Sequence, residues 1–180
     1  PKDRYEIVVS NNKSTDNTQV VIDAYCSRFD NIRTIFEGRQ GVHYARNSAA
    51  KVAKGDILYY TDDDMIADKD LLKNIVKVFL MGYNIGSATG KVLPKWEIEP
   101  PKWILKYCYN GLLSLNDKSE RLIIAPFDIG VFSCHQAVLR EAFFKSGGFN
   151  PENTAGEWIG DGETGLNIKI KELGYNFAFI

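Results

Sequence analysis

Three adjacent carboxylates, Asp62, Asp63 and Asp64, are the residues of this chain whose types and spacing best suit chemistry. They directly follow the apolar run 57–60, and negative charges crowded at the end of a strand repel one another unless a cation neutralises them. Hard divalent cations such as Mg²⁺ and Mn²⁺ prefer oxygen ligands, and they commonly combine one or two carboxylates with substrate phosphates. The triplet therefore indicates a divalent-cation site.

Two other interpretations of the triplet can be weighed on the same residues. A solvated loop that caps a helix is the first, because Asp68 and Asp70 continue the acidic run. A calcium-binding EF-hand loop is the second, and it needs Gly at its sixth position and Glu at its twelfth. Counted from Asp62, these positions hold Ala67 and Lys73, so the EF-hand is excluded while the solvated loop stays open.

Alternating strands and helices must position these carboxylates. Strands are expected at 5–9, 32–36, 57–60 and 85–92, and helices at 42–53 and 71–81. Another helix is expected from about Asp16, which has the spacing of a capping box with Gln19. Such alternation predicts an α/β fold with a mostly parallel sheet flanked by helices, whose ligands lie at the carboxyl ends of the strands. Two polar clusters follow strands in this way, 11–16 and 62–64.

The second half of the chain is less regular. Helices are expected at 136–145 and 163–173, each followed by Gly, and the sequence 177–180 has the character of a strand. Three Pro and two Trp interrupt the segment 94–103. No repeat and no long linker divides the chain, so the sequence predicts a single domain.

Composition narrows the classes of partner. The 180 residues carry 22 Lys and Arg against 23 Asp and Glu, and a formal net charge of −1 argues against a broad electrostatic grip on nucleic acid. No stretch approaches the ~20 apolar residues that a transmembrane helix needs. The 3 Cys are odd in number and show no metal-ligand spacing, which favours buried thiols in a reducing compartment.

Five stretches together resemble the family 2 glycosyltransferases, inverting enzymes of the GT-A fold that use nucleotide-sugar donors. In order along the chain they are the strand and Ser-Thr-Asp loop at 7–18, the Gly-x-x-x-Ala-Arg-Asn helix at 41–49, the strand and Asp-x-Asp motif at 55–64, the Gly-Gly-Phe-Asn-Pro turn at 147–151 and the acidic segment at 160–175. The resemblance implies a GT-A-type domain with a nucleotide-sugar-binding half at 1–92 and an acceptor and catalytic half at 93–180.

The resemblance implies roles for the acidic triplet and for one Arg. Asp62 and Asp64 would hold Mn²⁺ or Mg²⁺ against the diphosphate of the donor, with Asp62 turned toward the ribose or the metal. Asp63 would belong to the same nucleotide-binding site. Arg46 would contact the nucleotide near its base, and the alternative for this residue is an ion pair with a carboxylate.

The loop at 11–16 would complete the donor site, with two departures from the family pattern. Asn11 matches a position where relatives usually have an Asp that recognises the nucleobase, and an amide can donate as well as accept. Asp16 is assigned to the donor site as part of the same loop. Lys13 stands where many relatives have Gly, and a residue other than Gly carries a cost at a position of positive φ.

Asp161 is the candidate general base of the implied transfer. A single displacement needs a carboxylate that takes the proton of the acceptor hydroxyl in line with the leaving group. Glu163 is the second candidate, because its spacing to the following helix also fits. Either acid could instead cap the N-terminus of that helix. Trp158 could stack on an acceptor sugar or belong to the core.

Relatives of this kind usually begin with one more strand, which lies in the centre of the sheet, and extend beyond the position that matches Ile180. We therefore expect the chain to be truncated at both ends and the sheet to expose an unpaired edge. Alternative functions are a non-catalytic nucleotide-sugar-binding fragment and a nucleotidyltransferase of related fold.

The segment 90–132 is expected to form the acceptor side. Lys95-Trp96 and Lys102-Trp103 combine aromatic and basic character that suits a sugar or a membrane-associated acceptor, although ordinary packing of the two Trp explains them equally well. The expected partners are a nucleotide-sugar donor and a glycan or lipid-linked acceptor, with no nucleic acid. The expected location is cytoplasmic or peripheral at the inner face of the membrane.

Overall fold

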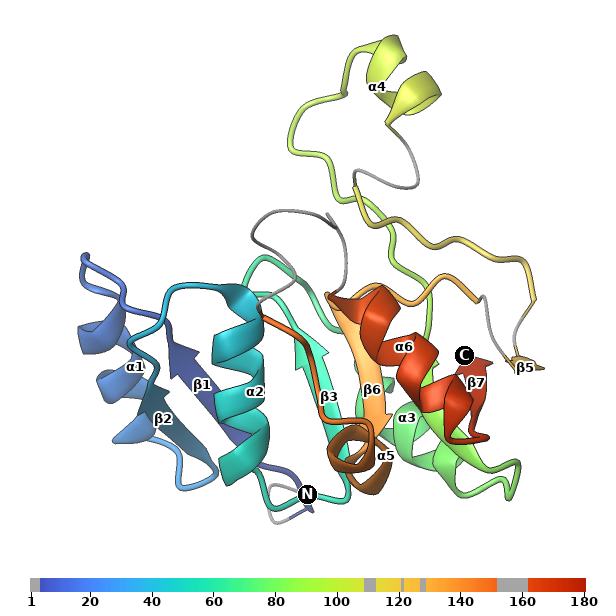
Figure 1. Cartoon of the computed structure of the whole chain (residues 1–180). Helices are drawn as coiled ribbons and strands as arrows, with labels where there is room; N and C mark the ends of the chain where they lie inside the picture. The colour runs from blue at the N-terminus through green and yellow to red at the C-terminus, as the bar shows by residue number, and fades with distance from the viewer. Residues whose placement is uncertain (1–3, 109–112, 121, 127–128, 152–161) are drawn as a thin grey trace.

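The computed structural model describes residues 4–108, 113–120, 122–126, 129–151 and 162–180. Figure 1 shows strands and helices in the order β1 (Ile7–Asn11), α1 (Thr18–Cys26), β2 (Ile32–Phe36), α2 (Val42–Val52), β3 (Ile57–Thr61), α3 (Leu71–Phe79), β4 (Ile85–Thr89), α4 (Lys102–Tyr107), β5 (Ile123–Ala125), β6 (His135–Leu139), α5 (Arg140–Lys145), α6 (Glu163–Glu172) and β7 (Asn176–Phe179). The strand predicted at 32–36 is confirmed at both ends, and the helices predicted at 42–53, 71–81 and 163–173 are confirmed apart from their last residues.

The strands form two sheets within the described residues. β1 and β2 are parallel neighbours, and the second sheet has the order β3-β6-β4-β7-β5. β6 runs antiparallel to both β3 and β4, while β7 is parallel to β4. The predicted α/β class is confirmed, but the larger sheet is mixed and not mostly parallel as predicted. β6 enters between β3 and β4 in the opposite direction, and β5 runs antiparallel to β7 at the edge.

The helix predicted at 136–145 is wrong in its first part. Residues 135–139 form β6, and the helix α5 begins only at Arg140. β6 is buried from His135 to Val138, so both of its faces are covered. A strand buried on both faces has no alternation of polar and apolar residues, and periodicity alone does not separate it from a buried helix.

β1 and β3 each keep one unpaired edge among the described residues, because β1 pairs only with β2 and β3 pairs only with β6. β1 is also poorly covered on its faces: Ile7 is exposed, and Val8 and Val9 are only half-buried. An apolar run of this kind is typical of a strand that is covered on both faces.

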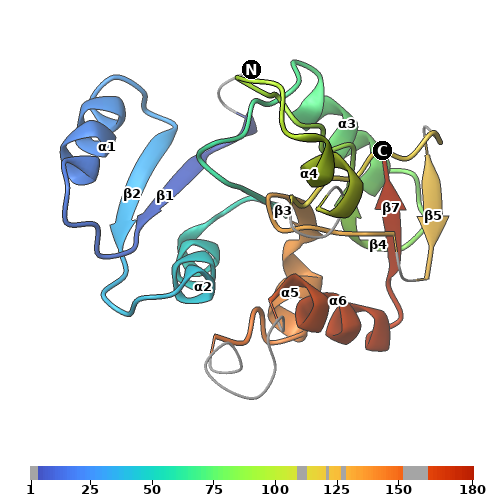
Figure 2. The same ribbon diagram turned by 90° about the horizontal axis from the view of Figure 1, so that it is seen from above.

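Helices cover the two faces of the sheets (Figure 2): α2, α5 and α6 lie on one face, and α1 and α3 lie on the other. Each face of the larger sheet has its own apolar core. Phe143, Phe149, Leu166 and Ile170 pack with Leu58 and Phe177 on the α5 and α6 side, and Ile75 and Val78 pack with Ala88 and Ala137 on the α3 side. The two cores fix the position of each helix along the strands. They therefore determine which helix residues lie near the strand ends.

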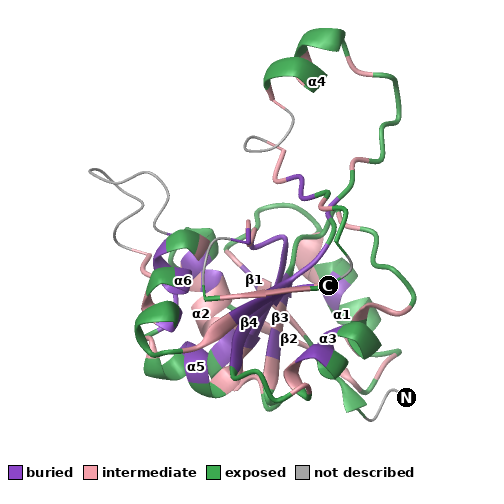
Figure 3. Cartoon of the chain, turned by 90° about the vertical axis from the view of Figure 1, so that its right-hand side faces the viewer, coloured by how far each residue is buried: buried purple, intermediate pink, exposed green. Residues whose placement is uncertain are grey.

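α4 belongs to neither layer. It stands on an arm that projects away from the sheets (Figures 1 and 3), and none of its residues is buried. None of the helices in the described parts of the chain has the length and apolarity that crossing a bilayer requires.

The predicted capping box at the start of α1 does not form. α1 begins at Thr18, whose backbone N–H and hydroxyl both donate to Asp16 Oδ1, at 3.0 and 2.5 Å. The Gln19 side chain does not reach back to Asp16, because its oxygen accepts from Asn11 and its nitrogen donates to Asp23. Asp16 thus orders the entrance to the helix through Thr18 alone, and these bonds to Thr18 lower the pKa of its carboxyl.

Lys13 has a φ of 60°, in the left-handed region that favours glycine. That conformation costs a residue with a Cβ about 1–2 kcal/mol, while glycine loses about 0.4–1 kcal/mol more chain entropy on folding. We expect Lys13→Gly to raise the free energy of unfolding by about 0.5–1 kcal/mol, measured by urea denaturation. Lys13→Ala removes the charge but keeps the Cβ, so it should give no such gain. Equal stabilisation by both variants would show that the charge matters and the backbone does not.

Candidate active site

Arg46 lies at the centre of the candidate site. It projects from α2 and donates through Nη2 to Asp62 Oδ1 and through Nη1 to Ser133 Oγ, both at 2.8 Å. Its side chain is 12% exposed, whereas that of Asp62 is 42% exposed. The guanidinium carbon also lies 5.8 Å from the centre of the Phe149 ring. The ion pair that the sequence left open for Arg46 is therefore formed, and its partner is one of the candidate metal ligands.

The acidic triplet lies at the carboxyl end of β3, as the sequence predicts. Asp62 follows the last residue of the strand, Asp63 and Asp64 form a turn, and all three residues are exposed. In the described residues, no three His, Cys, Asp or Glu side chains gather into a complete metal site. Exposed carboxylates on a turn fit a cation such as Mg²⁺ that takes its remaining ligands from substrate phosphates.

Glu163 approaches the same place from α6. Burial raises the pKa of the Cys134 thiol, and the nearby negative charges of Asp62 and Glu163 raise it further, while Arg46 lowers it. The start of α6 lies against α2, because a methyl group added at Gly162 would stand 2.6 Å from the imidazole of His43. Glu163 therefore begins α6 one residue after a contact with the helix that carries Arg46. Asp161 and Trp158 lie outside the described residues.

Asn11 and Asp16 serve the loop that follows β1. Asn11 is 4% exposed, and both polar atoms of its side chain are used: Nδ2 donates to Gln19 Oε1 at 2.7 Å, and Oδ1 accepts from the Ser14 N–H at 2.9 Å. Asp16 is exposed and accepts from Thr18. The side-chain hydrogen bonds described for these two residues stay within the loop and α1, and they do not reach Arg46 or Asp62.

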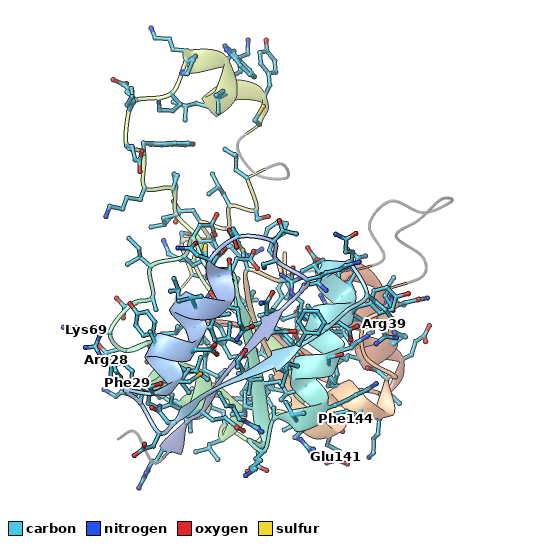
Figure 4. The ribbon with its side chains drawn as sticks, turned by 90° about the vertical axis from the view of Figure 1, so that its left-hand side faces the viewer. Arg28, Phe29, Arg39, Lys69, Glu141 and Phe144 are labelled. Carbon is cyan, nitrogen blue, oxygen red and sulfur yellow. The ribbon has the colours of Figure 1, made fainter. Side chains whose placement is uncertain are left out.

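The Asn12 side chain fixes the backbone between β2 and α2, a role that the sequence analysis missed. Its Nδ2 donates to the carbonyls of Glu37 and Arg39, and its Oδ1 accepts from the Gly41 N–H at 2.8 Å. Arg39, labelled in Figure 4, pairs with the Glu37 carboxylate at 2.8 Å and lies over the Tyr44 ring. No local signal marks Asn12, because its partners lie 25 to 29 residues further along the chain.

Asn47 connects α2 to the turn at 147–149. Its Nδ2 donates to the Phe149 carbonyl at 2.8 Å, and its Oδ1 accepts from the Phe149 N–H at 3.1 Å. Phe149 is 2% exposed and packs against Phe143 and Tyr60. The two-way hydrogen bond explains why Asn stands beside Arg46 on this helix: Asn47 holds one side of the site while Arg46 holds the other.

His135 is a second polar group that sequence reasoning missed. It begins β6 opposite Thr61, and its Nδ1 lies 2.8 Å from the Tyr59 hydroxyl. Burial lowers the pKa of His135, so the neutral ring is favoured at pH 7. The helix predicted at 136–145 concealed it, because only as the first residue of β6 does His135 lie at the strand end that carries Asp62.

The Trp residues of the predicted acceptor side are exposed. Trp96 is 41% exposed and Trp103 is 58% exposed, and both belong to the arm that carries α4. Ordinary packing under a loop, the alternative interpretation, would have covered them.

A separate hollow of about 680 Å³ lies away from these groups. It is lined by Lys51, Asp56, Leu139, Arg140, Glu141, Phe144 and Lys145. None of these is a candidate site residue, and Asp56 precedes β3, at the end of that strand opposite the acidic triplet.

The chain matches a known protein family in sequence. The family pattern described as Glycosyl transferase family 2 matches residues 1–148. The glycosyltransferase YfnE of Bacillus subtilis is 36% identical over 75 residues, which cover 42% of this chain and 19% of the relative. The probable glycosyltransferase YdaM of the same species is 27% identical over 189 residues, covering 99% of this chain and 42% of the relative. The chain thus spans less than half of the length of these relatives.

Solved structures share the fold. A mannosyltransferase from Pyrobaculum calidifontis, solved with GDP-Man and Mn²⁺, matches 98% of this chain and 46% of its own, with a TM-score of 0.68 and 24% identity. GalNAc-T7, solved with UDP, GalNAc and Mn²⁺, matches 100% of this chain and 37% of its own, with a TM-score of 0.71 and 19% identity. At these identities the similarity concerns the fold alone, that is, the arrangement of strands and helices.

Proposed function

Because the chain belongs to glycosyl transferase family 2 and has the GT-A fold, we propose that it transfers a sugar from a nucleotide-sugar donor to an acceptor hydroxyl with inversion at the anomeric carbon. One observation carries the proposal from the family to this chain: Arg46 of α2 donates to Asp62 at the carboxyl end of β3, at 2.8 Å. In open α/β sheets ligands bind at this end of the strands.

The donor is proposed to bind at residues 1–92. Asp62 and Asp64 are the residues that would hold Mn²⁺ or Mg²⁺, which, when bound, neutralises charge on the departing nucleoside diphosphate. Asp63 completes the turn. Two solved relatives of the same fold contain Mn²⁺ together with a nucleotide or nucleotide sugar, which supports this assignment.

Arg46, Asn11 and Asp16 are proposed to act on the nucleotide side of the donor. Arg46 can keep its bond to Ser133 while it turns part of its guanidinium from Asp62 to a phosphate or base, since this group has five N–H donors. Asn11 and Asp16 shape the loop after β1 through bonds to Ser14, Gln19 and Thr18, and we propose that the ordered loop faces the nucleobase.

The chemical step is proposed to be a single displacement. The acceptor hydroxyl attacks the anomeric carbon, its proton passes to Asp161, and the bond from that carbon to the diphosphate oxygen breaks. Glu163 is the alternative base, and it begins α6 directly after Gly162, which contacts His43 of α2. A carboxylate that contacts the acceptor hydroxyl can accept its proton as the new bond forms.

The acceptor is proposed to bind against residues 93–180. A glycan or lipid-linked acceptor suits the exposed Trp96 and Trp103, because aromatic faces bury the C–H surface of a sugar ring. Such an acceptor corresponds to a reaction in the cytoplasm or at the inner face of a membrane.

Calorimetric titration of a panel of nucleotide sugars, with and without Mn²⁺, tests the proposed donor and cation together. We expect one donor to bind with an affinity that depends on Mn²⁺, and the same donor to be consumed when an acceptor sugar is supplied. A protein that binds no nucleotide sugar under either condition contradicts the proposed function. Donor binding without transfer identifies a binding module instead.

A further inference from the structure

His43 is wedged between two segments of the candidate site. It lies in the first turn of α2 and is 7% exposed. Its imidazole stacks on the Phe149 ring, with 5.2 Å between ring centres and an angle of 14° between planes. At its edge lies Gly162, where an added methyl group would stand 2.6 Å from both Cε1 and Nε2. Those distances leave room for glycine alone, so imidazole and Gly162 are in direct contact.

This contact joins α2 to the start of α6. Gly162 is followed by Glu163, the first residue of α6, and preceded by Asp161 in the sequence. Both candidate bases are therefore covalent neighbours of a residue that His43 contacts. The position of the Gly162 backbone sets where Glu163 begins, and the imidazole limits how far that backbone can approach α2.

The same helix holds the donor side of the site. Arg46, three residues after His43, donates to Asp62 at 2.8 Å, and Asn47 holds the backbone of Phe149. Since Phe149 in turn forms the surface on which the imidazole stacks, the ring cannot move without disturbing the turn at 147–149. One rigid element thus sets the separation between the candidate cation ligand and the candidate base.

We propose that His43 is a positioning residue for sugar transfer: its imidazole fixes the backbone at Gly162 and thereby sets the distance between the base and the donor. This inference rests on the proposed function. His43 does not act on the reacting atoms, so its effect falls on the rate of the chemical step and leaves donor binding unchanged. A displacement of about 1 Å at a reacting group can lower a rate by about 100-fold.

Steady-state kinetics of Gly162→Ala and His43→Ala, in the full chain with the donor identified by calorimetry, test the proposal. We expect each variant to lower kcat by roughly 10- to 100-fold with the KM for the donor unchanged. The double variant should be no slower than the slower single variant, because the methyl group at position 162 occupies the space that the imidazole leaves. Gly38→Ala is the matched control, since its methyl group would meet only Phe36 Cε1, at 3.5 Å, and its kcat should equal that of the wild type.

Proton NMR without substrate tests the contact apart from activity. The chain has 2 His, so the Cε1–H signal of His43 is identified by its loss in His43→Gln. We expect Gly162→Ala to shift this signal and Gly38→Ala to leave it in place. An unshifted signal in Gly162→Ala overturns the contact on which the proposal depends.

The kinetics distinguish a failure of the positioning role from a failure of the proposed function. If the wild type transfers sugar and His43→Ala keeps its kcat, or if the losses of the two single variants multiply in the double variant, the positioning role is wrong and the proposed function stands. If the wild type binds a donor and transfers no sugar to any acceptor, both fail together. A parallel rise in the KM for the donor also overturns the positioning role, because it places His43 in donor binding.

Discussion

Replacing Asp161 with Asn is expected to lower the rate of sugar transfer by about 10²- to 10⁴-fold, the range that general base catalysis contributes. The amide has nearly the size of the carboxylate but cannot take the proton of the acceptor hydroxyl. Donor binding should stay close to that of the wild type, because the proposed donor site consists of Asp62, Asp64 and Arg46 on other elements. Initial rates at saturating donor and calorimetric donor affinity, measured on the same preparation, separate the two effects.

Glu163→Gln is the matched variant, because it makes the same chemical change two residues later. Glu163 begins α6, where a carboxylate also interacts favourably with the helix dipole, so this variant should lose a few tenths of a kcal/mol to about 1 kcal/mol of stability. Its transfer rate should fall much less than that of Asp161→Asn. Near-normal turnover in Asp161→Asn together with a large loss in Glu163→Gln would assign the base to Glu163.

The donor side of the site was largely predictable from the sequence. Short apolar runs before polar clusters predicted β1 and β3, and the rule that ligands lie at the carboxyl ends of strands placed Asp62 where the structure has it. Glycines and charged residues marked the helices closely enough to place Arg46 on α2. These features depend on residues that are near one another in the chain, and local patterns record them well.

The strand that completes the site was not predictable by the same means. Gln136 reads as a surface residue of a helix, yet it is fully buried in β6. Its Nε2 donates to Ser87 Oγ at 3.3 Å and to Asn167 Oδ1 at 3.0 Å, so partners from β4 and α6 satisfy its amide nitrogen. A polar residue whose partners lie far away in the sequence can be buried, and a local pattern of polarity then mispredicts its exposure.

Contacts between distant segments explain the other omissions. Arg46 and Ser133 lie 87 residues apart, and Asn47 and Phe149 lie 102 residues apart. Nothing near Arg46 in the sequence chooses between a nucleotide and a carboxylate as its partner, and only the folded chain brings Asp62 within 2.8 Å. The sequence could therefore name several residues of the candidate site, whereas their pairing had to come from the structure.

The double variant Asp62→Asn, Asp64→Asn is expected to lose the part of donor affinity and transfer that depends on Mn²⁺. A bound cation stabilises the departing diphosphate by several kcal/mol, so its loss should slow transfer by at least about 100-fold. The variant should fold, because the Asp62 side chain is 42% exposed and an ion pair with an exposed partner contributes only about 0–1 kcal/mol. Donor binding titrated against Mn²⁺ measures the effect directly.

Asp68→Asn is the control that separates a cation site from an acidic loop. Asp68 belongs to the same exposed run and accepts only from the Asp70 N–H, at 2.8 Å, in the contacts described for its side chain. If general negative charge in this loop were what mattered, removing it at Asp68 would weaken the Mn²⁺ dependence in proportion. If Asp62 and Asp64 ligate the cation, the control keeps the wild-type response. Unchanged Mn²⁺ dependence in the double variant would instead return the triplet to the solvated loop that the sequence left open, with Asp62 acting only as the partner that holds Arg46 in place.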